Sequence, residues 1–143
     1  MDYTYNNLVT DCDTIVEKIK LSGWFPDYIV GVTRGGLIPA VCLSHKLGIP
    51  LETVQWSTRD FGAREIAFGL QLKHDYTHKK LLIVDDIIDN GLTMSQIKIR
   101  LPQAKTAALI YNNNQTLVEA DYFGSVIDRS VETEWINFWW EKK

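Results

Sequence analysis

One short segment constrains the fold of this chain more than any other: an unbroken apolar run from Leu81 to Val84 that is followed directly by two aspartates. A strand without polar alternation is typical of a parallel sheet that helices cover on both faces. After a turn over residues 87–92, the pattern of residues 93–101 predicts a helix that ends before Pro102. The segment therefore predicts a strand, a loop and a helix in succession, which is the repeating unit of an α/β fold.

The same order recurs earlier in the chain. Residues 28–32 form an apolar, β-branched run that precedes Thr33-Arg34-Gly35-Gly36 and a helical stretch to Leu47. Strands that alternate with helices predict an α/β domain with a central, mostly parallel sheet flanked by helices. Four further segments have a helix or strand pattern: residues 8–19 (helix) and residues 51–57, 107–111 and 122–127 (strands).

Length and charge narrow the class of protein. With 143 residues, 45% of them hydrophobic, the chain is long enough for one globular domain with a core, and we expect residues 1–143 to form it. A net charge of -3 does not provide the basic face that nucleic acid requires. No apolar run approaches the ~20 residues that cross a bilayer, and the chain opens without a signal segment. We therefore expect a cytoplasmic protein that binds neither nucleic acid nor membrane.

Two loops offer groups that bind anions. Thr33-Arg34-Gly35-Gly36 has a cation and two glycines at the start of a predicted helix, where backbone N–H groups and the helix dipole favour negative charge. Asp89-Asn90-Gly91-Leu92-Thr93 has a turn glycine and a hydroxyl in a similar position. In α/β sheets, ligands bind at such loops, outside the carboxyl ends of the strands. A ligand phosphorylated at two places fits both loops, whereas neither loop matches the nucleoside-triphosphatase or dinucleotide-binding patterns.

Three carboxylates beside these loops predict the rest of the ligand. Asp85 and Asp86 are not suited to bind phosphate directly, so we expect them to bind a metal or hydroxyl groups. A ribose diol would provide such hydroxyl groups. Asp89, further into the turn, can face a reacting carbon and accept a proton. Taken singly, an Arg-Gly-Gly turn or an acidic strand end is often only structural, but their combination is far more specific.

The residues from Val84 to Thr93 resemble the PRPP-binding motif of type I phosphoribosyltransferases, and those from Val32 to Pro39 resemble the pyrophosphate loop of that family. The tail from Trp135 to Glu141 is similar to the purine branch, particularly the xanthine–guanine and hypoxanthine enzymes. The resemblance implies the type I phosphoribosyltransferase fold, with a flexible catalytic loop and a small C-terminal hood. It implies a pentosyltransferase of purine salvage that transfers ribose 5-phosphate from phosphoribosyl pyrophosphate (PRPP) to a purine, in particular guanine, xanthine or hypoxanthine, and releases pyrophosphate.

The resemblance also implies roles for individual residues. Asp85 and Asp86 would hold the ribose hydroxyls and Mg²⁺, and Asp89 would be the general base near purine N7. Asn113 stands where members selective for 6-oxopurines usually carry a lysine, which leaves the base preference open. We further expect a homodimer or homotetramer. The remaining implied contacts are the 5′-phosphate at Asp89, Asn90, Gly91, Leu92 and Thr93, the pyrophosphate at Thr33, Arg34 and Gly35, the mobile loop at Ser57, Thr58 and Arg64, and the base at Asn113, Trp135 and Ile136.

Other functions stay open. A regulatory protein with this fold would keep the PRPP site and sense nucleotides without turnover, although the chain has no appended nucleic-acid module and keeps the carboxylate that a catalyst needs. A flavodoxin-like binding module would explain the alternating elements but not the acidic pair. Transfer to a base other than a purine is a further alternative.

Overall fold

The protein is described by a computed structural model that covers residues 1–57, 64–67, 76, 78–114 and 116–141. Six of its described strands form the main sheet, in the order β4-β3-β2-β5-β6-β7. All neighbours in this sheet are parallel except β4 and β3. The predicted mostly parallel sheet is therefore confirmed. The strands are β2 Tyr28–Thr33, β3 Leu51–Ser57, β4 Arg64–Ala67, β5 Leu81–Ile88, β6 Lys105–Asn112 and β7 Tyr122–Ile127.

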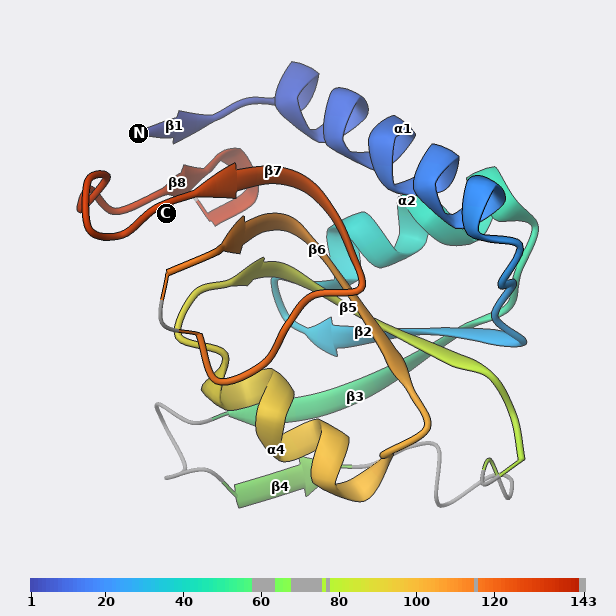
Figure 1. Cartoon of the computed structure of the whole chain (residues 1–143). Helices are drawn as coiled ribbons and strands as arrows, with labels where there is room; N and C mark the ends of the chain where they lie inside the picture. The colour runs from blue at the N-terminus through green and yellow to red at the C-terminus, as the bar shows by residue number, and fades with distance from the viewer. Residues whose placement is uncertain (58–63, 68–75, 77, 115, 142–143) are drawn as a thin grey trace.

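Helices cover both faces of the sheet (Figure 1). Helices α1 (Tyr5–Ser22) and α2 (Leu37–Leu47) lie on one face, and α4 (Leu92–Arg100) lies on the other. None of the helices in the described residues is long and apolar enough to cross a membrane.

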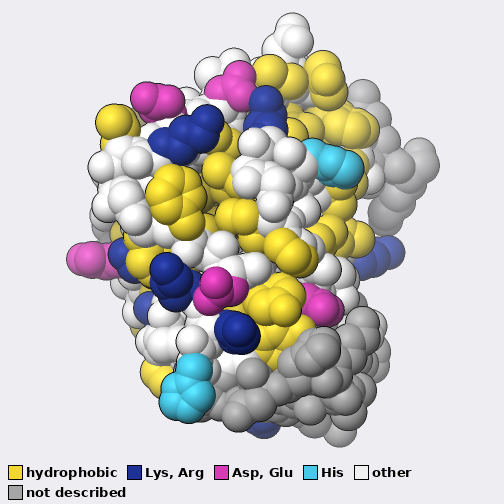
Figure 2. All heavy atoms as spheres, turned by 90° about the vertical axis from the view of Figure 1, so that its right-hand side faces the viewer, with side chains coloured by type: hydrophobic (Ala, Val, Ile, Leu, Met, Phe, Trp, Pro, Cys, Tyr) yellow, Lys and Arg dark blue, Asp and Glu magenta, His cyan; other side chains and the backbone are white. Residues whose placement is uncertain are grey.

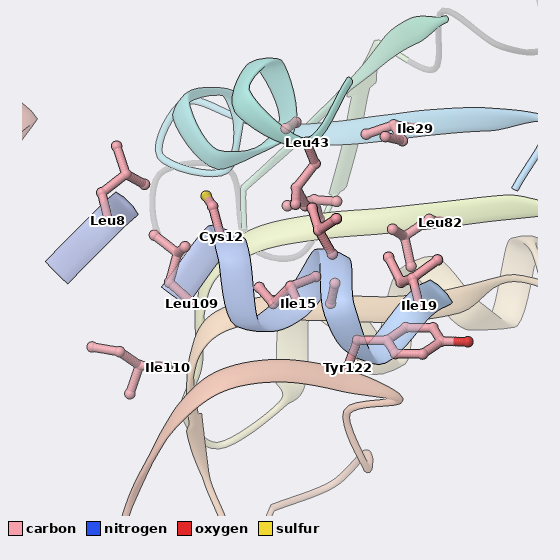
Figure 3. Close-up of a cluster of buried hydrophobic side chains, with 14 of the residues drawn as sticks. Leu8, Cys12, Ile15, Ile19, Ile29, Leu43, Leu82, Leu109, Ile110 and Tyr122 are labelled. Atoms are coloured by element: carbon pink, nitrogen blue, oxygen red, sulfur yellow. The ribbon is translucent and has the colours of Figure 1, made fainter. Parts of the chain in front are cut away.

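The apolar run of β5 contributes to two separate cores because successive strand residues point to opposite faces. Leu82 and Val84 pack with α1 and α2, whereas Leu81 and Ile83 belong to the cluster under α4. Leu82 points toward Ile19 of α1 (Figure 3). Burial on both faces explains why this strand has no polar alternation before its aspartates.

Three features differ from the sequence-based prediction. The predicted strand was too short, because β5 continues through the acidic pair to Ile88, where Asp85 pairs with Ala108 and Ile88 with Tyr111. The stretch predicted as a loop beyond residue 57 contains β4, which pairs antiparallel with β3. A third element was not predicted, since two-residue strands carry no periodic signal: β1 (Asp2–Tyr3) pairs parallel with β8 (Asn137–Phe138).

The connections of the sheet place a topological switch point between β2 and β5. From β2 the chain passes through α2 to β3 on one side, and from β5 it passes through α4 to β6 on the other side. In open α/β sheets, ligands bind at such a switch point, at the carboxyl ends of the strands. The two predicted anion-binding loops follow β2 and β5 and therefore lie at this switch point.

The C-terminal segment, residues 128–141, forms the predicted hood. It follows β7 and contains β8 and the short 3₁₀ helix η1 (Trp139–Glu141). Aromatic side chains join it to the N-terminal strand, with ring centroids 5.1 Å apart for Tyr3 and Phe138 and 5.9 Å apart for Tyr3 and Trp140.

At the other end of the sheet, the described charged side chains are of both signs. On the face at the amino ends of the strands, Lys and Arg side chains lie among acidic and hydrophobic ones (Figure 2). Among the residues that the structure describes, that face therefore presents no continuous basic patch.

Candidate active site

The acidic pair and the Arg34-Gly35-Gly36 loop lie in direct contact. A Cβ atom on Gly35 would overlap the Asp86 carboxylate, and one on Gly36 would lie 2.7 Å from the Val32 carbonyl oxygen and 2.8 Å from the Asp85 Cα. Only glycine has no Cβ, so the loop can approach the end of β5 this closely. The structure thus brings Gly35 together with the predicted ribose-binding carboxylates.

Both carboxylates are held by backbone N–H groups at the end of the strand. Asp85 Oδ1 accepts a hydrogen bond of 2.9 Å from the Asp86 N–H, and Asp86 Oδ1 accepts one of 2.8 Å from the Ile87 N–H. These bonds fix the direction of each side chain relative to β5.

Burial makes this pair electrostatically costly. It raises the pKa of Asp85 well above its ordinary value, and the neighbouring Asp86 carboxylate adds to this rise. Burial also raises the pKa of Asp86, although hydrogen bonds from Asp85 and from the Ile87 backbone oppose the shift. Two adjacent buried carboxylates need a compensating cation or hydroxyl donors nearby.

The pair fits the requirements of Mg²⁺. Oxygen ligands suit this ion, which is often bound by one or two carboxylates together with waters and substrate phosphates. No group of three or more metal-ligating side chains occurs in the residues that the structure describes, so a closed cage made by the protein alone is not present there. A site that the substrate completes fits this arrangement.

The loop after β5 has the geometry of an anion-binding helix start. Gly91 has a φ of 83° and α4 begins directly after it, while Asn90 Oδ1 accepts a hydrogen bond of 2.9 Å from the Leu92 N–H. In the described part of the chain, the N–H groups of Thr93 and Met94 have no acceptor. These N–H groups and the positive end of the helix favour a phosphate here.

Asp89 lies between this loop and the hood, and its carboxylate is paired. Arg129 Nη2 is 3.0 Å from Asp89 Oδ2, and Arg129 Nε is 3.1 Å from Asp89 Oδ1. The buried Asn112 side chain at the end of β6 donates to the Asp89 carbonyl oxygen at 3.1 Å. The predicted general base is therefore held by two residues from other parts of the chain.

The predicted base-binding residues differ in their surroundings. Trp135 is 64% exposed, whereas Ile136 is buried in the core. Asn113 is exposed and its N–H donates to the Ile127 carbonyl oxygen at 3.1 Å. The amide that faces Asp89 belongs to the preceding residue, Asn112, rather than to Asn113.

Other predicted site residues are less closely joined to this centre. Arg34 is exposed in the loop after β2, and the Thr33 hydroxyl donates to the Val54 carbonyl oxygen at 3.4 Å. Ser57 ends β3 and Arg64 begins β4, where the two pair. Thr58 and most of the predicted mobile loop lie outside the described residues, so the prediction that this loop is mobile stays untested.

Sequence reasoning missed Arg129 and Asn112. Arg129 stands in a hood segment without periodic pattern, 40 positions from its partner Asp89. The only available signal was indirect: Asn112 follows a buried strand, where polar side chains of an α/β sheet meet the ligand edge.

Comparison with known proteins agrees with this geometry. The phosphoribosyl transferase domain matches residues 3–142, nearly the whole chain. The chain belongs to the phosphoribosyltransferase family, a family of glycosyltransferase-type enzymes, which confirms the predicted family.

Two curated relatives and one solved structure are similar over most of this chain. It is 36% identical over 118 residues to a xanthine-guanine phosphoribosyltransferase of Idiomarina loihiensis, covering 79% of this chain and 70% of that protein. The corresponding protein of Chromohalobacter salexigens is 29% identical over 117 residues, covering 79% and 67%. A purine phosphoribosyltransferase from Pyrococcus horikoshii has a TM-score of 0.82 and 31% identity, covering 100% of this chain and 94% of that one.

Proposed function

We propose that this chain transfers the ribose 5-phosphate of PRPP to a purine base and releases pyrophosphate. The observation that carries the proposal is the contact between Gly35 and the Asp86 carboxylate, because it places a loop suited to pyrophosphate against carboxylates suited to a ribose. The pyrophosphate of PRPP is bonded to the anomeric carbon of the ribose. The contact between Gly35 and Asp86 therefore lies beside the bond that breaks in the transfer. The names of the relatives, which are purine and xanthine-guanine phosphoribosyltransferases, support the same reaction.

In this proposal, each loop binds one phosphorylated end of PRPP. The Arg34 side chain and the Gly35 backbone hold the pyrophosphate, and the N–H groups at the start of α4, including that of Thr93, hold the 5′-phosphate. Asp85 and Asp86 bind the ribose hydroxyls and would hold Mg²⁺. When bound there, the ion would supply positive charge to the leaving pyrophosphate.

The base binds beside Asp89 and the hood. Trp135 provides an aromatic face on which a purine stacks, and the Ile136 backbone reads the edge of the ring. Asp89 accepts the proton that leaves a ring nitrogen as the new bond to ribose forms. These roles follow the resemblance and agree with the exposure of Trp135 and the position of Asp89.

A 6-oxopurine is the proposed acceptor, in accord with the names of the two curated relatives. Asn113 replaces the lysine expected at its position and offers only a neutral donor and an acceptor. We therefore propose a weaker preference among guanine, xanthine and hypoxanthine than a lysine would give. The proposal includes a cytoplasmic enzyme that works as a homodimer or homotetramer.

A panel of bases tests this function. The protein is incubated with PRPP and Mg²⁺ and with guanine, xanthine, hypoxanthine, adenine, orotate or uracil, and nucleotide formation and pyrophosphate release are measured. We expect turnover with at least one 6-oxopurine. The Asp85→Asn/Asp86→Asn variant serves as the matched control and should be inactive with every base.

Two results would contradict the proposal. Transfer to orotate or uracil alone would remove the purine assignment and keep phosphoribosyl transfer. Binding of PRPP without pyrophosphate release with any base would instead favour the regulatory protein that senses nucleotides.

A further inference from the structure

We propose that Arg129 is a positioning residue that holds the Asp89 carboxylate and the hood in one fixed arrangement. Arg129 thereby fixes the position of the proton acceptor, Asp89, relative to the aromatic side chain that binds the base, Trp135. The inference rests on the proposed function, because that function gives Asp89 and Trp135 their roles.

The first half of the link joins Arg129 to both oxygens of Asp89. Arg129 Nε lies 3.1 Å from Oδ1 and 3.3 Å from Oδ2, and Nη2 lies 3.0 Å from Oδ2. A planar guanidinium that meets a carboxylate with two nitrogens fixes the orientation of the carboxylate as well as its position. Asn112 Nδ2 also lies 3.4 Å from Oδ1, and the Asp89 side chain remains 44% exposed, so a ligand can still reach the carboxylate.

The second half joins the same guanidinium to the backbone of the hood. Arg129 Nη1 donates to the Glu132 carbonyl oxygen at 3.1 Å and to the Glu134 carbonyl oxygen at 2.6 Å. Glu134 directly precedes Trp135, so its carbonyl sets where the chain enters the base-binding residue. One side chain thus spans from the carboxylate of Asp89 to the backbone that presents Trp135.

Asn112 reinforces the link from the end of β6. Its Oδ1 accepts from the Arg129 N–H at 3.3 Å, and its Nδ2 donates to the Asp89 carbonyl oxygen at 3.1 Å. Both partners of the ion pair are therefore also held at their backbones. This makes their relative position a property of the fold rather than of two flexible side chains.

Burial separates this ion pair from ordinary surface pairs, which contribute little because water screens them and their side chains move. The Arg129 side chain is 22% exposed, whereas that of Asp89 is 44% exposed. The arginine is thus the enclosed partner, and the carboxylate is the one that faces outward. This is the arrangement expected if Arg129 positions Asp89 and the Asp89 carboxylate contacts the ligand.

Four variants test the link: Arg129→Gln, Arg129→Lys, Asp89→Asn and the double variant Arg129→Gln/Asp89→Asn. We expect Arg129→Gln to lower kcat about 10- to 100-fold, in keeping with the loss of hydrogen bonds to a charged group. Arg129→Lys should recover part of kcat, since it restores the charge. Its base KM should nevertheless be higher than that of the parent protein, because lysine has no planar fork to hold both Asp89 and the hood. A role in stability alone would not separate kcat from KM in this way.

The double variant shows whether Arg129 acts through Asp89. Loss of the general base lowers turnover by about 10² to 10⁴. If Arg129 acts through that carboxylate, adding Arg129→Gln to Asp89→Asn should cost less than about 3-fold in kcat, since the effects of coupled residues do not add. Ser130→Ala is the matched control, because it removes the 2.6 Å hydrogen bond from the Ser130 hydroxyl to Asp128 in the same segment and leaves the hydrogen bonds of the Arg129 and Asp89 side chains in place. It should leave kcat unchanged.

A measurement independent of activity separates failure of the link from failure of the proposed function. In ¹H–¹⁵N spectra, the Arg129 Nε–H signal should be protected from exchange with water in the parent protein and lose this protection in Asp89→Asn. Protection without transfer to any purine would refute the proposed function and retain the link. Equally fast exchange in both proteins, or an active parent whose kcat is unchanged by Arg129→Gln, would overturn the inference.

Discussion

Replacing Gly35 with alanine tests the contact at the centre of the site. The new Cβ would lie 2.8 Å from the Asp86 Cγ and would overlap one oxygen of that carboxylate. Gly35 is not among the described glycines with a positive φ, so alanine causes no backbone strain at this position. The effect of Gly35→Ala therefore comes from the overlap with Asp86.

The overlap cannot be relieved by a simple side-chain rotation. Asp86 is only 9% exposed, and the Ile87 N–H holds its other oxygen at 2.8 Å. Overpacking of this kind costs about 1–3 kcal/mol. For a domain of this size, that is a fall of about 3–10 °C in Tm. Displacement of the carboxylate should weaken PRPP binding at least about tenfold, as expected for a lost hydrogen bond to a charged group.

Thermal unfolding and PRPP titration in the presence of Mg²⁺ measure the two effects. Asp86→Ala removes the group that the new methyl would strike, so Gly35→Ala/Asp86→Ala should regain the Tm of Asp86→Ala alone without regaining PRPP binding. Gly48→Ala is the control: Gly48 has a φ of 67° and its added Cβ would meet no atom within 4 Å, so it costs backbone strain and leaves PRPP binding intact. A Gly35→Ala protein with the parental Tm and PRPP affinity would refute the packing of this loop against Asp86.

Three further changes test other parts of the molecule. Trp135→Ala should raise base KM about 5- to 100-fold through loss of stacking and leave PRPP affinity unchanged; an unchanged base KM would remove Trp135 from the base site. Gly91→Ala should lower Tm and PRPP affinity together, because Gly91 combines a φ of 83° with close neighbours, whereas Gly48→Ala should lower Tm alone. Burial and the hydrogen bond to Asp11 raise the pKa of Tyr3 above its ordinary value of 10.0, so the stability that its proton provides is present below pH 10 and is lost as the pH rises further. Tyr3→Phe should therefore lower Tm at pH 8 and reduce the fall in Tm between pH 9 and 11; an equally steep alkaline fall would contradict this.

The parts of the site that lie within one strand, loop and helix could be predicted from the sequence. Asp85 and Asp86 follow an apolar strand directly, and Gly91 marks the turn before α4, so local pattern and turn chemistry locate them. Gly35 was also expected to approach an anion closely. The sequence did not reveal that Gly35 is needed for a second reason, the contact with Asp86, because that contact joins β2 and β5, which are far apart in the chain.

The rest of the site depends on contacts that leave no periodic trace. Arg129 looks like any polar residue of an irregular segment, and only the folded chain brings its guanidinium to Asp89. The hood is likewise held by the pairing of β1 and β8, strands too short to give a pattern. Side-chain links between distant segments are set by tertiary packing, which local propensity does not encode.

The error in the predicted end of β5 falls at residues of the proposed site. A strand with buried neighbours is expected to end where charges begin, yet β5 continues through Asp85 and Asp86 to Ile88. The backbone pairing with β6 holds the two carboxylates in the sheet, although their burial raises both pKa values. Such an arrangement is unfavourable for the unliganded protein and becomes favourable when hydroxyls and a cation meet the pair, since buried charges are stable only when compensated. A local rule is therefore broken at the proposed site, where the proposed ligand would restore the balance, as is expected of functional sites.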